Sequence, residues 1–210
     1  MSAKPIPTRE AERTFTGNVI GCDEVGRGCL FGPVVVCACF VPLDVHIEGV
    51  RDSKLMTSSQ RERAYDELIH HPRVRYVLTE RTAAQIDEVN ILQATMDCML
   101  EAVKSIRRDL EIGGVLVDGN RVPEEFRKDP EFSNLAVRAI PKGDQKCYCI
   151  AAASVIAKVT RDRMMTALDK VYPVYGLAQH KGYPTKVHKE ALKKYGPTPL
   201  HRQSFSGVVQ

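Results

Sequence analysis

The chain has 210 residues, of which 43% are hydrophobic and 27% charged, and its formal net charge is +4 at pH 7. This length and composition suit one sizeable globular domain, and the small positive charge permits a nucleic-acid partner without requiring one. The seven cysteines are odd in number and form no Cys-x-x-Cys pair, which argues against a disulfide framework or a structural zinc site. We therefore expect a reducing, intracellular setting, and no apolar run reaches the length of a membrane span.

The first 17 residues are polar, contain Pro5 and Pro7, and include no secretory apolar region. We expect residues 1–17 to be a flexible leader and residues 18–210 to form a single catalytic domain. Glutamates alternate with the arginines of the leader, which gives little support to a mitochondrial transit peptide. A cytoplasmic location is expected, with mitochondrial or nuclear targeting left open.

An apolar run at residues 19–22 predicts a buried strand, and it ends in two adjacent acids, Asp23 and Glu24. Carboxylates at the end of a core strand are costly unless a cation binds there, and hard divalent metals take oxygen ligands. The Gly-Arg-Gly sequence at residues 26–28 adds a positive charge and exposed backbone amides, which suits a phosphate-bearing substrate. A strand that ends in a solvated acidic turn is the alternative.

Further strands and helices alternate along the rest of the chain. Strands are expected at residues 34–41, 73–79, 115–117 and 135–140. Helices are expected after a capping box at Ser59 and Glu62, at 90–108, from near Asp144 to about 170, and at 185–195. This order indicates an α/β fold with helices packed over a sheet.

Asp118 repeats the first pattern, because it follows a short apolar strand and precedes Gly119. The carboxyl ends of strands gather at one edge of an open α/β sheet, so Asp118 is expected close to Asp23 and Glu24. Asp144 follows the fifth strand by a short turn and can reach the same edge, although it could also be an ordinary helix N-cap. Four acids at one place would repel one another, and two Mg²⁺ or Mn²⁺ ions would neutralise them.

Several sequence motifs occur in the order typical of ribonuclease HII, the type 2 ribonuclease H family, and together they span roughly residues 18–206. The motifs lie at residues 21–28, 52–54, 117–119, 142–146, 152–159, 161–163 and 180–183. The chain resembles this family closely enough to imply a ribonuclease H-like fold. Such a fold has a five-stranded mixed sheet flanked by helices, here with a short helical C-terminal segment. The implied activity is hydrolysis of the RNA strand of RNA–DNA hybrids and incision 5′ to single ribonucleotides embedded in duplex DNA.

The resemblance also implies which residues form the site. The four metal ligands of the family fall on Asp23, Glu24, Asp118 and Asp144, which would hold two divalent ions, Mg²⁺ or Mn²⁺. We expect Asp162 to lie outside this set and to form an ion pair instead, because Arg161 and Arg163 flank it.

The substrate-binding residues implied by the resemblance are Gly26, Arg27 and Gly28, which would read the ribose 2′-hydroxyl. Tyr183 would stack against the sugar at the RNA–DNA junction, whereas on its own it would be an ordinary, partly buried surface aromatic. Lys54 and Lys181 are the expected phosphate contacts, although most lysines only solvate a surface. The acids between residues 119 and 143 are expected in a solvated loop.

The expected partners are RNA–DNA hybrids and ribonucleotide-containing duplex DNA, bound by a monomer that does not associate with a membrane. A non-catalytic nucleic-acid-binding protein is the first alternative, but concentrated negative charge facing phosphates would not help such a protein. Another nuclease of the same broad fold, such as a resolvase or integrase, is the second alternative. The Gly-Arg-Gly sequence and Tyr183 favour ribose recognition instead.

Overall fold

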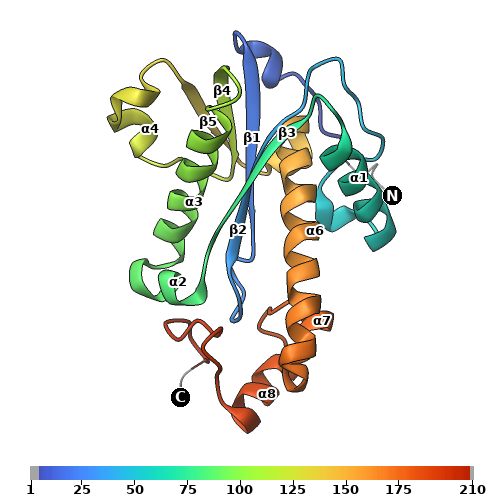
Figure 1. Ribbon diagram of the computed structural model, residues 1–210, viewed down its shortest axis with the longest axis vertical. Coiled ribbons are helices and arrows are strands. Elements are labelled where there is room, and N and C mark those ends of the chain that lie inside the picture. Colours follow the sequence, from blue (N-terminus) through green and yellow to red (C-terminus); the bar gives the residue numbers. More distant parts are fainter. Residues whose placement is uncertain (1–4, 209–210) are drawn as a thin grey trace.

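The computed structural model describes residues 5–208 and is built on a sheet of five strands in the order β3-β2-β1-β4-β5 (Figure 1). The strands are β1 (Asn18–Val25), β2 (Val34–Phe40), β3 (Arg75–Arg81), β4 (Ile112–Asp118) and β5 (Ala136–Ile140). β2 is antiparallel to both β1 and β3, whereas β4 is parallel to both β1 and β5. The predicted five-stranded mixed sheet is therefore confirmed.

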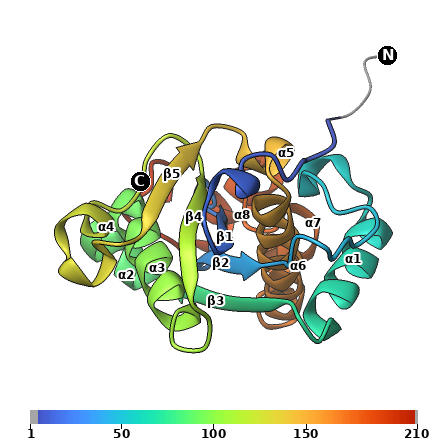
Figure 2. The same ribbon diagram turned by 90° about the horizontal axis from the view of Figure 1, so that it is seen from above.

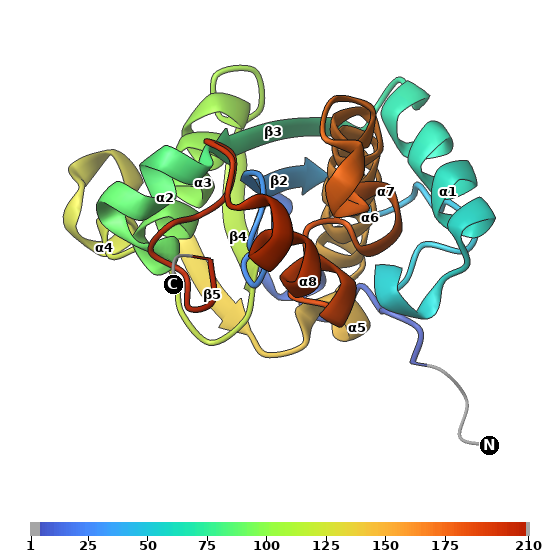
Figure 3. The same ribbon diagram turned by 90° about the horizontal axis from the view of Figure 1, so that it is seen from below.

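Helices cover both faces of the sheet, as the view along its edge shows (Figure 2). The longer helices are α1 (Ser58–His70), α3 (Ile91–Ile106), α6 (Tyr148–Val171) and α8 (Lys186–Tyr195), and the shorter ones are α2 (Ala83–Val89), α4 (Glu125–Lys128), α5 (Gly143–Lys146) and α7 (Leu177–His180). α2 and α3 lie on one face, and α1 and α6 on the other, while α7 and α8 gather at one end (Figure 3). Within residues 5–208, no helix is long and apolar enough to cross a membrane.

Side chains of β2 alternate between the two faces, as the pleat of a strand requires. Val34, Val36 and Ala38 pack with the α3 side of the core, whereas Cys37 and Cys39 pack with the α6 side. Because both faces are covered, the strand is apolar at every position. This explains the uninterrupted hydrophobic run in the sequence.

The start of α6 lies directly against β1. A methyl group added at Gly21 would lie 2.3 Å from the carbonyl carbon of Cys149 and from the amide nitrogen of Ile150. Only glycine permits this approach of strand and helix. The close packing brings the helical segment after β5 next to the carboxyl end of β1.

Several boundaries differ from the sequence prediction. The helix expected from Asp144 to about 170 is interrupted at Cys147, whose backbone is extended (φ −115°, ψ 126°), so that α5 and α6 are separate. Asp144 lies in the first turn of α5 and is not an N-cap. The capping box before α1 is formed by Thr57 and Gln60, two residues earlier than predicted, because their side chains bond each other's backbone amides.

The acidic segment between β4 and β5 is folded rather than being only a solvated loop. It contains α4 and a 3-10 turn at Pro130–Phe132, and the buried rings of Phe126 and Phe132 meet edge to face with centroids 5.0 Å apart. Lys104 of α3 pairs with Asp129 at 3.3 Å and with Glu131 at 3.5 Å. These contacts anchor the segment to α3.

The expected leader also packs against the domain over residues 8–15. Thr8 pairs with Cys147, and the buried Glu12 accepts a hydrogen bond of 2.8 Å from the amide of Cys149, at the N-terminus of α6. Arg9 neutralises Glu12 at 2.6 Å and donates to the carbonyl oxygen of Val41. This segment therefore caps α6, and the flexible leader predicted for residues 1–17 is not observed there; residues 1–4 lie outside the described part.

We expect Glu12→Ala to lower the free energy of unfolding by about 3 kcal/mol, because it leaves a largely buried Arg9 without its partner and an α6 amide uncapped. Glu10→Ala is the matched control: Glu10 is exposed, so its substitution should change stability by less than about 0.5 kcal/mol. Urea unfolding of the three proteins measures both effects. Equal effects of the two substitutions would contradict the capping role of Glu12.

Candidate active site

Four carboxylates come together at one edge of the sheet. Asp23 and Glu24 lie at the carboxyl end of β1, and Asp118 is the last residue of the neighbouring parallel strand β4. Asp144 follows β5 in the first turn of α5, where the preceding amide of Gly143 donates a 2.6 Å hydrogen bond to Asp118 Oδ1. Parallel pairing of β4 with both β1 and β5 thus places all four acids at the same edge.

Asp23 is at the centre of this group, with 5% of its surface exposed. Burial raises its pKa well above the ordinary value, and repulsion from Glu24, Asp118 and Asp144 raises it further, while a hydrogen bond with Ser154 opposes the shift. A carboxyl group in these surroundings is costly to ionise without a nearby cation.

Glu24 and Asp144 have cationic neighbours, which offset only part of the cost of burying their charges. Burial raises the pKa of Glu24, although Arg27 Nη1 lies 3.2 Å from its Oε1. Burial also raises the pKa of Asp144, although Lys54 Nζ lies 3.1 Å from its Oδ2. Lys54, predicted to contact phosphate, therefore contacts the acidic group itself.

The donor set suits hard divalent metal ions. All four groups are carboxylates, and Glu24 Oε2 is buried without a hydrogen-bond partner among the described residues. Within residues 5–208, however, no three His, Cys, Asp or Glu side chains are placed closely enough to hold a metal ion as they stand. Such ions would offset the repulsion around Asp23 and supply a partner for Glu24 Oε2.

The Gly-Arg-Gly loop follows β1 directly, beside the acids. Gly26 has φ +93°, and a Cβ there would lie 2.3 Å from Arg161 Nε, so both the backbone and the space require glycine. A Cβ at Gly28 would meet nothing within 4 Å, so this position faces open space. The Arg27 side chain is 45% exposed, which leaves it available to a ligand as well as to Glu24.

Two buried arginines, whose role was not predicted from the sequence, hold this loop. Arg161 donates to the carbonyl oxygens of Phe31, Pro33 and Lys181 at 2.8–2.9 Å. Arg202 donates to the carbonyl of Arg27 at 2.9 Å, and burial lowers its pKa to about 10. Arg161 lies in the motif at residues 161–163, but the carbonyls that the two arginines bind come from segments distant in the chain, so local sequence does not indicate these contacts.

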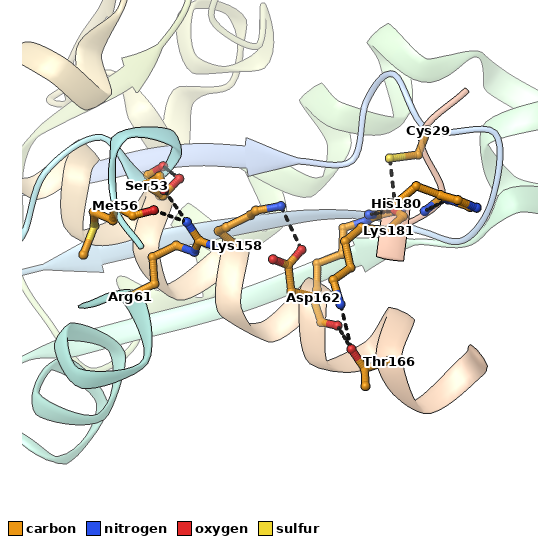
Figure 4. Close-up of polar contacts among 12 residues, drawn as sticks. Cys29, Ser53, Met56, Arg61, Lys158, Asp162, Thr166, His180 and Lys181 are labelled. Atoms are coloured by element: carbon orange, nitrogen blue, oxygen red, sulfur yellow. Dashed lines mark hydrogen bonds and ion pairs between the residues drawn. The ribbon is translucent and has the colours of Figure 1, made fainter. Parts of the chain in front are cut away.

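Lys181 and Tyr183 lie on the segment that Arg161 ties to the loop. Lys181 Nζ donates to Thr166 Oγ1 on α6 at 2.8 Å, and Cys29 Sγ lies 3.6 Å from the Lys181 carbonyl (Figure 4). Tyr183 keeps 39% of its surface exposed, and burial of the remainder raises its pKa. The segment that carries Lys181 and Tyr183 is thus tied through Arg161 to the loop that follows β1.

Asp162 lies on α6 and forms an ion pair, as expected, but its partner is neither Arg161 nor Arg163. Lys158 Nζ, one turn earlier, donates to Asp162 Oδ1 at 2.8 Å (Figure 4). Arg163 pairs with Glu62 of α1 instead. Within residues 5–208, no hydrogen bond or ion pair joins Asp162 to any of the four acids.

The sequence matches the family model described as Ribonuclease HII over residues 20–208. The chain belongs to the ribonuclease HII family. This membership confirms the resemblance carried by the sequence motifs, and it decides against a non-catalytic binder and against a resolvase or integrase.

Individual relatives agree with the family match. The chain is 44% identical to the ribonuclease HII of Alkaliphilus metalliredigens (strain QYMF) over 191 residues, covering 90% of this chain and 89% of the relative. It is 42% identical to the ribonuclease HII of Francisella tularensis subsp. tularensis (strain WY96-3418), covering 90% and 96%. The crystal structure of ribonuclease H2 from Pyrococcus horikoshii OT3 superposes with a TM-score of 0.69 at 32% identity, covering 91% and 95%.

The ribonuclease HII family comprises endoribonucleases that hydrolyse the RNA strand of RNA–DNA hybrids and depend on divalent metal ions. The chain is therefore an enzyme acting on nucleic acid, and the predicted ribonuclease H-like fold is confirmed. The carboxylates at the carboxyl ends of β1 and β4 are the residues of this structure whose chemistry suits that dependence.

We expect Asp23→Asn to raise the stability of the metal-free protein, because the amide keeps the hydrogen-bonding shape and removes a repelled charge. The folded-state pKa of Asp23 is raised, so its unfavourable contribution grows as pH rises above about 4, the ordinary value for Asp. The stability difference between variant and wild type should therefore widen with pH and narrow when Mg²⁺ is added. Thermal unfolding from pH 4 to 8 measures it, and a difference that does not depend on pH would contradict the repulsion.

Proposed function

We propose that the enzyme incises duplex DNA on the 5′ side of a single embedded ribonucleotide, as well as cutting RNA–DNA hybrids, with two divalent ions held by Asp23, Glu24, Asp118 and Asp144. The observation that supports this most directly is the contact between the two parts of the site. Arg27, within the loop proposed to read ribose, forms an ion pair of 3.2 Å with Glu24, one of the proposed ligands.

Paired Mg²⁺ or Mn²⁺ ions, when bound, activate a water molecule and stabilise the oxygen that leaves the phosphodiester. The protein's own part is to hold the four carboxylates at fixed positions. The amide of Gly143 orients Asp118, and Lys54 lowers the cost of ionising Asp144. Arg27 does the same for Glu24 and can also meet a phosphate of the substrate.

Ribose recognition is supported by the state of the Gly-Arg-Gly loop. Arg202 donates a hydrogen bond to the carbonyl oxygen of Arg27, and the amides of residues 27 and 28 have no hydrogen-bond partner among the described residues. Free amides flanked by glycines can approach a 2′-hydroxyl closely, and this hydroxyl distinguishes RNA from DNA at a given position. The half-exposed ring of Tyr183 offers a flat face for the adjoining sugar.

The deciding assay is cleavage of a DNA duplex that contains one ribonucleotide, with and without Mg²⁺ or Mn²⁺. Incision 5′ to the ribonucleotide that requires the metal supports the proposal, and failure to cut this duplex while hybrids are cut would refute it. The monomeric state and the cytoplasmic location expected from the sequence stay predictions.

In this assay Asp144→Asn should reduce the rate of incision in Mg²⁺ by at least about a hundredfold, because it removes a charge that the ions require. Asp162→Asn is the matched control on α6 and should reduce the rate by less than about threefold, since its ion pair with Lys158 is local. Circular dichroism confirms that both variants are folded. The reverse order of effects would remove Asp144 from the metal site.

Tyr183→Ala should weaken incision at a single ribonucleotide about tenfold more than it weakens cutting of a long hybrid. A hybrid offers many 2′-hydroxyls and registers, whereas one junction offers a single register that stacking must fix. Tyr183→Phe should retain both activities, and Tyr195→Ala, at a tyrosine that is also half exposed, serves as the control. Equal losses on both substrates would show that Tyr183 does not select the junction.

A further inference from the structure

Three histidines are buried together behind the segment that carries Tyr183. His180 ends α7, His188 lies in α8, and His201 lies in the C-terminal segment beyond it, with exposed fractions of 8%, 0% and 1%. The rings of His180 and His188 stack with centroids 4.5 Å apart. None of the three can reach solvent to bind substrate directly.

The backbone fixes the direction of the hydrogen bonds in this cluster. The amide of Thr198 can only donate, and it lies 2.9 Å from His201 Nδ1. The carbonyl oxygen of Tyr183 can only accept, and it lies 3.0 Å from His188 Nδ1. Since each neutral imidazole has one donor and one acceptor, His201 Nε2 must donate to His188 Nε2, across 3.2 Å.

His180 forms a second, parallel connection. Its Nε2 lies 2.7 Å from the carbonyl oxygen of Tyr175, so Nε2 donates. Its Nδ1 then accepts from the amide of Gly182 at 3.2 Å. Histidines therefore bond the backbone on both sides of the peptide link between Gly182 and Tyr183.

The rings of His188 and His201 are neutral in this arrangement. A second proton on His201 would face the amide of Thr198, and one on His188 would face the N–H of His201. Burial lowers the pKa of His188, and burial together with the neighbouring His188 lowers the pKa of His201 to about 4. The hydrogen-bond directions are thus stable at neutral pH.

The same segment is held from its other side by the loop after β1. The amide of Leu30 donates to the carbonyl of Gly182 at 2.8 Å, and a Cβ at Gly182 would lie 2.8 Å from the carbonyl oxygen of Phe31. With Arg161 on the carbonyl of Lys181, the peptide before Tyr183 has little freedom to move. The hydrogen bond from His188 Nδ1 to the Tyr183 carbonyl supplies the remaining contact.

We propose that His188 and His201 are positioning residues, whose directed hydrogen bonds fix the backbone at Tyr183 and thereby the ring that meets the sugar at the junction. This inference rests on the role of Tyr183 in the proposed function. It predicts that a substitution that breaks these hydrogen bonds lowers incision at a single ribonucleotide more than it lowers cutting of a hybrid, while the four acids are unchanged.

The first test measures the histidine tautomers by ¹⁵N NMR of the full-length, metal-free protein, with assignments from single substitutions. His188 is expected in the Nδ1–H form, and His180 and His201 in the Nε2–H form, at pH 7. This result does not depend on activity, so it separates the hydrogen-bond connection from the role of Tyr183. An Nε2–H form of His188, or a protonated ring among the three, would overturn the inference.

The second test compares His188→Asn with His188→Leu on both substrates. Asparagine places an N–H donor near the position of Nδ1 and should keep incision at a single ribonucleotide within about threefold of wild type, whereas leucine should lower it about tenfold relative to hybrid cutting. The loss is expected mainly in kcat, because the ring is misplaced rather than absent. Val187→Ala, at an exposed neighbour on α8, is the control.

If His188→Leu does not fold, His201→Asn replaces it, because the shorter amide can accept from Thr198 but does not reach His188. His188 Nε2 then has no donor, so the ¹⁵N chemical shift of this nitrogen should change in the NMR spectrum, with a selective loss of incision at the single ribonucleotide. Unchanged selectivity in the folded variants, while Tyr183→Ala is selective, would refute the positioning role alone. Unchanged selectivity in Tyr183→Ala would refute the proposed role of Tyr183 instead.

Discussion

Repulsion among buried carboxylates at the carboxyl ends of β1 and β4 is the constraint around which the rest of the structure is arranged. Asp23 has almost no contact with solvent, and its neighbours are other acids. Lys54, Arg27 and Ser154 each relieve part of this cost, and none removes it. The fold therefore keeps a group of acids that is unfavourable for stability, which is a common balance between stability and activity in an enzyme.

The buried positive charges next to the Gly-Arg-Gly loop have partners of a different kind from those of the acids. Arg161 and Arg202 are fully buried, and both donate hydrogen bonds to backbone carbonyls rather than to carboxylates. Their bonds join the loop after β1 to the segment that carries Lys181 and Tyr183. The buried arginines therefore hold the backbone of both segments and form no ion pair with the four acids among the described residues.

The functional elements differ in how far local sequence reveals them. An apolar strand that ends in an acid is a local pattern, so Asp23, Glu24 and Asp118 could be predicted as a group, and continuous apolar runs predicted most of the strands. The break at Cys147 could not be predicted, because it arises where Thr8 pairs with this residue and Glu12 caps the following helix. The ordered segment at residues 8–15 was missed for the same reason: its partners lie far away in the chain.

The sequence by itself determined the fold class, the family and the chemistry of the acids, because periodicity, residue type and motif order are properties of neighbouring residues. Only the tertiary structure decided what Lys54, His188 and Arg202 do. Each is polar and would ordinarily be exposed, yet Lys54 contacts Asp144 and the other two are buried against backbone groups. Such a role depends on which distant carbonyl, amide or carboxylate lies within hydrogen-bonding distance, and folding alone sets that distance.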